Sequence, residues 1–220
     1  MPVGVTTVVI DPGHNGDNWQ HTAEINRSVT VPTGHKPCDT AGTTTASGYT
    51  ESGYNLAVAQ LVAPILEERG LQVLLTRTND AGWGPCIDQR VALADRAAAA
   101  ATVSIHADGW PVGRGFSVLY AAPTPGSPDT ASPLALADRR LAVDVRDAMA
   151  ADTGLPVSDY SGADGLVTVP WPTLYTVPEV LVETGNMRSP ADAALLESGA
   201  FRPRVARAIA DGIGAFLAGR

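Results

Sequence analysis

Apolar and polar residues follow two different spacings along the chain. Short runs rich in Val, Ile and Leu predict buried strands, and they lie at residues 5–10, 71–76, 102–105, 115–120 and 179–182. Apolar residues at helical spacing, or a Ser-Pro start, predict helices at residues 53–69, 86–101, 132–153, 189 onward and 200–218. Strands that alternate with helices indicate an α/β fold. We therefore expect a twisted, mostly parallel sheet of about six strands, flanked by helices on both faces.

Two segments depart from this alternation. Residues 15–50 form a polar stretch rich in Thr, Gly, Ser and Asn, and a loop of this length usually has a function or a small structure of its own. Residues 29–31, Val-Thr-Val, fit one arm of a short hairpin within it. Residues 154–178 are rich in proline and are predicted to be irregular, with Trp171 and Tyr175 exposed.

Length and charge narrow the class of protein. The 220 residues fit one compact domain, 1–220, without an internal repeat. No apolar run reaches the roughly 18 residues that a membrane helix needs, so we expect no membrane insertion. The net charge of −8 and the pI of about 4.8 argue against nucleic acid or an anionic membrane as the main partner. We expect a monomer.

The two cysteines bear on the cellular compartment. Cys38 and Cys86 each lie in a loop with a preceding proline, and such a pair in a chain with no other cysteine predicts one disulfide and an oxidising compartment. Two unrelated free thiols are the alternative. We expect a secreted, periplasmic or cell-wall protein. No signal peptide precedes the first strand, so an exported protein would make Met1 the start of a mature fragment.

Four residues whose side chains can bind a metal or transfer protons lie where strands end or a helix begins. The run at residues 8–16, Val-Val-Ile-Asp-Pro-Gly-His-Asn-Gly, places His14 on the loop that leaves the first strand. His106 and Glu183 follow two later strands, and Glu51 comes just before the first helix. Ligands and catalytic groups gather at the carboxyl ends of strands in open α/β sheets. We therefore treat these four as candidate site residues.

Their side chains suit a catalytic zinc ion. Two histidines, a carboxylate and an open water position form a recognised catalytic zinc set, here His14, Glu51 and His106. Zinc lowers the pKa of water to about 7, and a further carboxylate must take the proton and pass it to the leaving amine. Glu183 is the candidate for that role. Each residue also has a structural explanation, such as a histidine that bonds its own turn or an acid that favours a helix N-terminus.

Other polar residues are weaker candidates. His21 and His35 lie in the polar stretch and follow no strand, so we expect both to be exposed to solvent. Asp11 has three possible roles: a metal ligand, a hydrogen-bond partner of a ligand, or a residue that bonds the backbone N–H groups of its own turn. The last role is the more common one for aspartate in Asp-Pro-Gly. Asp108 follows His106 by two residues and has a position from which it can orient a ligand.

The same blocks resemble a known family. The run at 8–16, Glu51, Ser-Ile-His-Ala-Asp at 104–108 and Leu-Val-Glu-Thr-Gly-Asn at 181–186 look like the motifs of the zinc-dependent N-acetylmuramoyl-L-alanine amidases of the Amidase_3 type, in the family's order. The resemblance extends from residue 5 to about residue 217 and looks closest to the small secreted mycobacterial and actinobacterial members.

The resemblance implies a fold, a reaction and residue roles. The family fold is a twisted, mostly parallel sheet flanked by helices. The residues that match His14, Glu51 and His106 bind zinc in that family, and the one that matches Glu183 is the catalytic glutamate. The implied reaction is hydrolysis of the amide between N-acetylmuramic acid and the L-alanine of the stem peptide, in peptidoglycan or muropeptides.

The sequence departs from the family pattern in places. It has His-Ala-Asp-Gly where the family often has His-Ala-Asn, and residues 166–178 are rich in Pro and Trp where an arginine and leucine pattern is common. Some relatives carry an inhibitory helix over the zinc site, but residues 121–132 and 155–178 show no strong helical pattern to match it. We expect an open site, with residues 15–50 as the one candidate lid.

Three other functions compete with this interpretation. A zinc carboxypeptidase or deacetylase on a related scaffold would need a cationic clamp for a substrate carboxylate, for which Arg114 and Arg188 are candidates. A non-catalytic binding module predicts a broken ligand set, whereas all four expected residues are present. A phosphate-binding loop at 11–16 would need the G-x-G-x-x-G pattern or a P-loop lysine, and the sequence has neither there.

Overall fold

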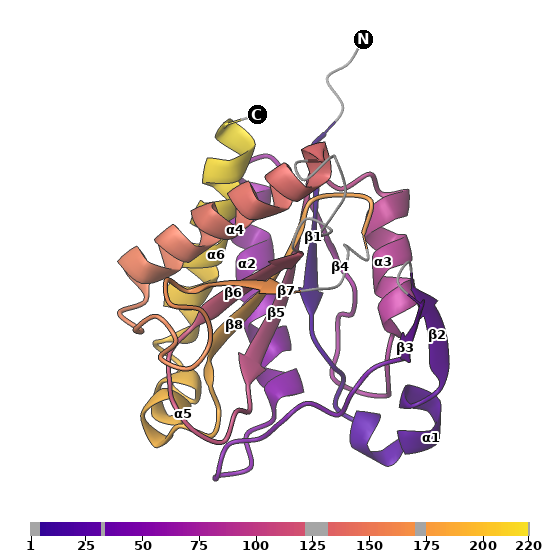
Figure 1. Ribbon diagram of the computed structural model, residues 1–220, viewed down its shortest axis with the longest axis vertical. Helices are drawn as coiled ribbons and strands as arrows, with labels where there is room; N and C mark the ends of the chain where they lie inside the picture. Colours follow the sequence, from indigo (N-terminus) through magenta and orange to yellow (C-terminus); the bar gives the residue numbers. More distant parts are fainter. Residues whose placement is uncertain (1–4, 32–33, 122–131, 170–174, 220) are drawn as a thin grey trace.

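The computed structural model describes residues 5–31, 34–121, 132–169 and 175–219, and its centre is a six-stranded sheet (Figure 1). The strand order is β4-β1-β5-β8-β6-β7. The strands β1, β4, β5 and β8 are mutually parallel, β6 is antiparallel to β8, and β7 is parallel to β6. Their bounds are Thr7–Pro12 for β1, Gln72–Leu75 for β4, Ala101–Asp108 for β5, Ser117–Ala121 for β6, Leu166–Val169 for β7 and Glu179–Asn186 for β8. The predicted mostly parallel sheet is confirmed.

Helices cover the two faces of this sheet unequally. Three long helices pack on one face and on one another, namely α2 (Glu51–Glu68), α4 (Pro133–Asp152) and α6 (Arg202–Ala218). On the other face, α3 (Ile87–Arg96) packs over β1 and β4 through Ala94, against Val9 and Leu74. The short helix α5 (Pro190–Leu196) follows β8. Helices therefore flank both faces, as predicted.

The alternation of side chains along the strands separates a core face from a polar face. In β5, Val103 and Ile105 point into the large core under the three long helices, and in β8 Val180 and Val182 do the same. Successive side chains of a strand point to opposite faces. The intervening residues of β5, β8 and β1 therefore face the side of α3, and they include Ser104, His106, Glu179, Glu183 and Asp11.

Two predictions about residues 154–178 are wrong. The segment contains a strand, β7, which pairs in register with β6 through Leu166 and Val118. Tyr175 is only 7% exposed, because it packs with Val9 and α3 rather than facing solvent. Trp171, the other residue expected to be exposed, lies outside the described residues.

The polar stretch at residues 15–50 carries a small structure of its own. A 3-10 turn, η1 (Asn18–Gln20), and a short helix, α1 (Thr22–Ile25), precede an antiparallel hairpin of β2 (Ser28–Val31) and β3 (Gly34–Pro37). The predicted hairpin is confirmed. The predicted disulfide is present too. It joins Cys38, the residue after β3, to Cys86, the residue before α3. It ties the hairpin to the body of the protein beside α3.

We expect the disulfide to contribute strongly to stability. It closes a loop with a sequence separation of 48, and a cross-link of this kind limits the unfolded chain, so replacing both cysteines by serine should lower the free energy of unfolding by about 2–4 kcal/mol. Denaturant unfolding of the Cys38→Ser/Cys86→Ser variant measures this. The unmutated protein in reducing buffer should show the same loss, and an unchanged midpoint in both would contradict the prediction.

Candidate active site and metal centre

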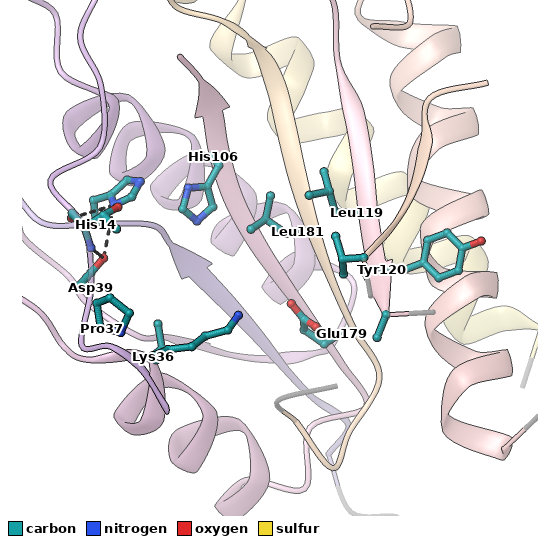
Figure 2. Close-up of a pocket in the computed structure, with 13 residues that line it drawn as sticks. His14, Lys36, Pro37, Asp39, His106, Leu119, Tyr120, Glu179 and Leu181 are labelled. Atoms are coloured by element: carbon teal, nitrogen blue, oxygen red, sulfur yellow. Dashed lines mark hydrogen bonds and ion pairs between the residues drawn. The ribbon is translucent and has the colours of Figure 1, made fainter. Parts of the chain in front are cut away.

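His14 is held in an unusual backbone conformation on the loop after β1. Its φ of 61° lies in the left-handed region, which costs free energy for a residue other than glycine and is enriched at functional sites. The ring atom Nδ1 lies 3.0 Å from the Thr40 carbonyl oxygen and 3.4 Å from Asp39 Oδ1 (Figure 2). These partners turn the other ring nitrogen, Nε2, toward Glu51, whose Oε1 lies 3.1 Å away.

Glu51 is fixed at the first turn of α2. The helix begins after Thr50, whose side chain accepts a hydrogen bond from the Gly53 N–H and caps it. One carboxylate oxygen of Glu51, Oε2, accepts the Thr43 N–H at 3.0 Å, and the other, Oε1, faces the two histidines. The backbone at Gly42 passes so close that a Cβ there would lie 3.0 Å from Oε2, at a φ of +75°. Glycine is therefore required at this approach.

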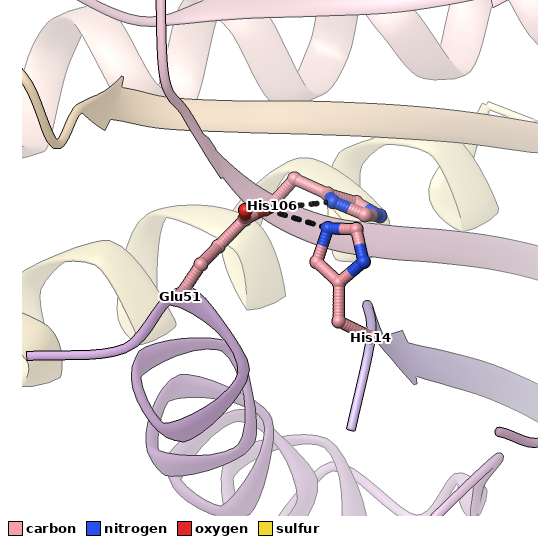
Figure 3. A group of neighbouring side chains, drawn as sticks. All are labelled: His14, Glu51 and His106. Atoms are coloured by element: carbon pink, nitrogen blue, oxygen red, sulfur yellow. Dashed lines mark hydrogen bonds and ion pairs between the residues drawn. The ribbon is translucent and has the colours of Figure 1, made fainter. Parts of the chain in front are cut away.

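The three predicted ligands come together from three different elements (Figure 3). His106 on β5 directs Nδ1 to within 2.9 Å of Glu51 Oε1, and the ligand atoms of His14, Glu51 and His106 all lie within 4.8 Å of one another. Zinc bonds of about 2.0–2.2 Å in a tetrahedron put ligand atoms roughly 3.4 Å apart. The two nitrogens and one oxygen therefore fit a single metal ion of this size.

The groups of this cluster shift one another's pKa values. Burial raises the pKa of Glu51, but hydrogen bonds from His106 and His14 outweigh it and hold the carboxylate pKa well below its usual value. Burial lowers the pKa of His14, but hydrogen bonds to Asp39 and Glu51 outweigh it and raise the pKa to about 10. The cluster thus attracts positive charge, which is what a cation site requires.

Glu183 lies beside the cluster on the same face of the sheet. It is the register partner of His106 across β5 and β8. Its Oε2 is buried and has no hydrogen-bond partner among the described residues. Burial, together with the negative charges of Glu51 and Asp108, raises the pKa of Glu183 well above its usual value. A carboxyl group that holds its proton more firmly than usual, with a free oxygen, suits proton transfer.

A buried network of ion pairs on the α3 side holds His14 in place. The sequence predicted little of this network. Arg90 on α3 donates to Asp11 Oδ1 at 2.6 Å, to Asp39 Oδ2 at 3.1 Å and to the carbonyl oxygen of His14 at 3.0 Å. Asp11 therefore does not brace its own turn but supports His14 through Arg90 and Asp39. Nothing local in the sequence marks Asp39, whereas Arg90 lies at helical spacing from the apolar residues Ile87 and Ala94 of α3, which is a signal of an inward-facing arginine.

The other candidates lie elsewhere. His21 is partly exposed and pairs with Glu24 at 3.4 Å, and His35 is exposed on β3. Asp108 accepts a hydrogen bond from the Tyr160 hydroxyl at 2.8 Å. It lines a hollow with Glu183 rather than contacting a ligand histidine.

The two arginines proposed as a clamp do not lie at the metal cluster. Arg114 is paired with the buried Asp192 at 3.1 Å. Arg188 is exposed and lines a neighbouring hollow with Gly42 and Thr43. Neither arrangement supports the carboxypeptidase alternative.

Comparison with known proteins identifies the family. The family model described as N-acetylmuramoyl-L-alanine amidase, Amidase_3, matches residues 8–215, which include all four candidate site residues. The chain belongs to this family. The amidase is therefore an enzyme, a peptidoglycan hydrolase, as the sequence motifs indicated.

Similar proteins agree with this assignment. The N-acetylmuramoyl-L-alanine amidase Rv3717 of Mycobacterium tuberculosis is 41% identical, over 96% of this chain and 86% of the relative. The amidase AmiA of Salmonella typhimurium is 30% identical, over 94% and 81%. The crystal structure of the amidase Ami1 from Mycobacterium smegmatis is 37% identical with a TM-score of 0.87, over 100% of both chains. The predicted likeness to mycobacterial members is confirmed.

Proposed function

We propose that this amidase uses zinc, held by His14, Glu51 and His106, to cleave the amide between N-acetylmuramic acid and the L-alanine of the stem peptide. The observation that carries the proposal is the convergence of Nε2 of His14, Oε1 of Glu51 and Nδ1 of His106 beside Glu183, whose Oε2 has no hydrogen-bond partner in the described part of the chain. Two imidazoles and one carboxylate are a donor set that zinc favours in hydrolases.

The metal and the residues around it have different roles in the proposed reaction. A zinc ion held by His14, Glu51 and His106 would supply positive charge that polarises an amide carbonyl, acidifies water and offsets the carboxylates that raise the Glu183 pKa. Glu183 accepts a proton from the attacking water and donates it to the departing alanine nitrogen. Asp39 and the Thr40 carbonyl hold Nδ1 of His14, which keeps its other nitrogen facing the cluster.

The disulfide bears on the compartment in which the enzyme acts. A structural disulfide joins Cys38 and Cys86, and such bonds persist in oxidising compartments. None of the helices in the described part of the chain is long and apolar enough to span a membrane. We propose that the enzyme acts outside the cytoplasm, in the periplasm or the cell wall, as a monomer on peptidoglycan or muropeptides.

Digestion of purified muropeptides tests the reaction and the metal together. The expected products are the free sugar part and a peptide with a new N-terminal alanine, identified by mass. A chelator should abolish turnover, zinc should restore it, and elemental analysis should find about one zinc per chain, as the one three-ligand cluster among the described residues implies. Turnover that survives complete metal removal would contradict the role of zinc. Cleavage of another bond would contradict the proposed substrate site.

A further inference from the structure

Two hollows of different character meet at the metal cluster. The first, of about 320 Å³, lies on the polar face of the sheet and includes His14 and His106 at one end. Leu119 and Leu181 from β6 and β8 form its apolar floor (Figure 2). This volume lies within the range of pockets that bind small ligands.

An acidic and a basic side chain face each other across the far end of this first hollow. Glu179, at the start of β8, and Lys36, on β3 of the hairpin, both line it, and the Lys36 side chain extends toward Glu179 (Figure 2). The disulfide one residue beyond β3 fixes the wall that carries Lys36. A ligand that enters from the metal cluster therefore passes over leucines before it meets one acidic and one basic side chain.

The balance of charge at that end favours a cation. Burial raises the pKa of Glu179 to about 8, and the carboxylates of Asp138 and Asp11 add to the effect, whereas Lys36 opposes it. Asp138 Oδ2 is itself buried without a hydrogen-bond partner among the described residues. An ammonium group beside Glu179 would relieve the repulsion among these carboxylates.

The second hollow is wider and more polar, with a volume of about 430 Å³. It opens from the same cluster in the direction of Glu183 and is lined by Thr40, Thr43 and Asp108. Trp110 stands at its edge and is 55% exposed. Hydroxyls, a carboxylate and an exposed aromatic ring suit a sugar better than an aliphatic peptide side chain.

We propose that the first hollow is the stem-peptide subsite, in which Glu179 binds the amine and Lys36 the carboxylate at the zwitterionic end of a diamino-acid side chain. The leucine floor then accommodates the aliphatic part of that side chain, and the sugar occupies the second hollow. This inference rests on the proposed function. It makes Glu179 and Lys36 specificity-determining residues, which neither bind the metal nor move protons in the reaction.

Three substrates separate the contributions of the two charges. They are an N-acetylmuramoyl dipeptide, the tripeptide that ends in L-lysine, and the tripeptide that ends in meso-diaminopimelate. The lysine side chain carries the amine alone, and that of diaminopimelate carries an amine and a carboxylate. We expect kcat/KM to rise about tenfold from the dipeptide to the lysine tripeptide and again to the diaminopimelate tripeptide, mostly through KM, because each step adds one charge-assisted hydrogen bond.

Two variants should each lower a different ratio of kcat/KM between these substrates. Glu179→Gln should reduce the preference for the lysine tripeptide over the dipeptide to the part that the leucine floor supplies, and Lys36→Met should remove only the preference for diaminopimelate over lysine. Glu67→Gln, an exposed change on α2, is the matched control and should leave both ratios unchanged. Thermal unfolding of each variant establishes that its fold is intact.

The outcomes distinguish this inference from the proposed function. Equal kcat/KM of the unmutated enzyme for all three substrates would overturn the subsite, even though the amidase reaction stands. Unchanged ratios in both variants would overturn the assignment of Glu179 and Lys36. Failure to cleave any of the three at the sugar–alanine amide would overturn the proposed function itself.

Discussion

Replacing Glu183 by glutamine is expected to lower kcat by about 10²–10⁴, the range that a positioned proton-transfer group contributes. Glutamine has the same shape but neither accepts a proton from water nor passes one to the leaving nitrogen. The metal should stay bound, because Glu183 supplies none of the three clustered ligand atoms. The loss should appear in kcat rather than KM, since the substrate contacts are retained.

Steady-state kinetics and zinc content of the Glu183→Gln protein, measured on the same preparation, test this. Glu68→Gln, an exposed glutamate on α2, is the matched control and should behave as the unmutated enzyme. Activity within tenfold of the unmutated enzyme would refute the proton-transfer role. Loss of zinc together with activity would instead make Glu183 a part of the metal site.

The sequence predicted which residues gather at the candidate site better than it predicted their surroundings. His14, Glu51 and His106 were identifiable because strand ends and helix starts in a parallel sheet converge at one edge, whatever their separation along the chain. In β5 the alternation Val103-Ser104-Ile105-His106 also separates core from site, a signal that assigns His106 to the polar face. The strand was predicted to end there, whereas it continues to Asp108.

What the sequence did not reveal depends on contacts between distant segments. The four residues of β7 form a strand by pairing with the edge of β6, and four apolar or β-branched residues between a glycine and a proline carry little information alone. Tyr175 is buried because α3 and Val9 approach it from elsewhere in the chain. Local pattern cannot supply either fact. The same limit applies to Arg90, which the pattern places on a helix but not among carboxylates.

Arg90→Met is expected to destabilise the fold and the metal site together. The Arg90 side chain is 4% exposed and lies between Asp11 and Asp39. Burial lowers its pKa, but those two carboxylates outweigh burial and hold the pKa above its usual value. Methionine would leave both carboxylates buried without their cation, and breaking a buried ion pair on one side costs about 3–5 kcal/mol.

Metal affinity should fall with the stability of the Arg90→Met protein. Asp39 then loses the charge that fixes it against His14, and loss of such a supporting partner typically weakens metal binding about 10–100-fold. Denaturant unfolding of the metal-free protein measures the first effect, and competition with a zinc chelator measures the second. Arg139→Met, at an exposed position of α4, is the matched control for loss of one positive charge. A loss of stability below about 1 kcal/mol, the value of an exposed pair, would mean that the network does not support the site.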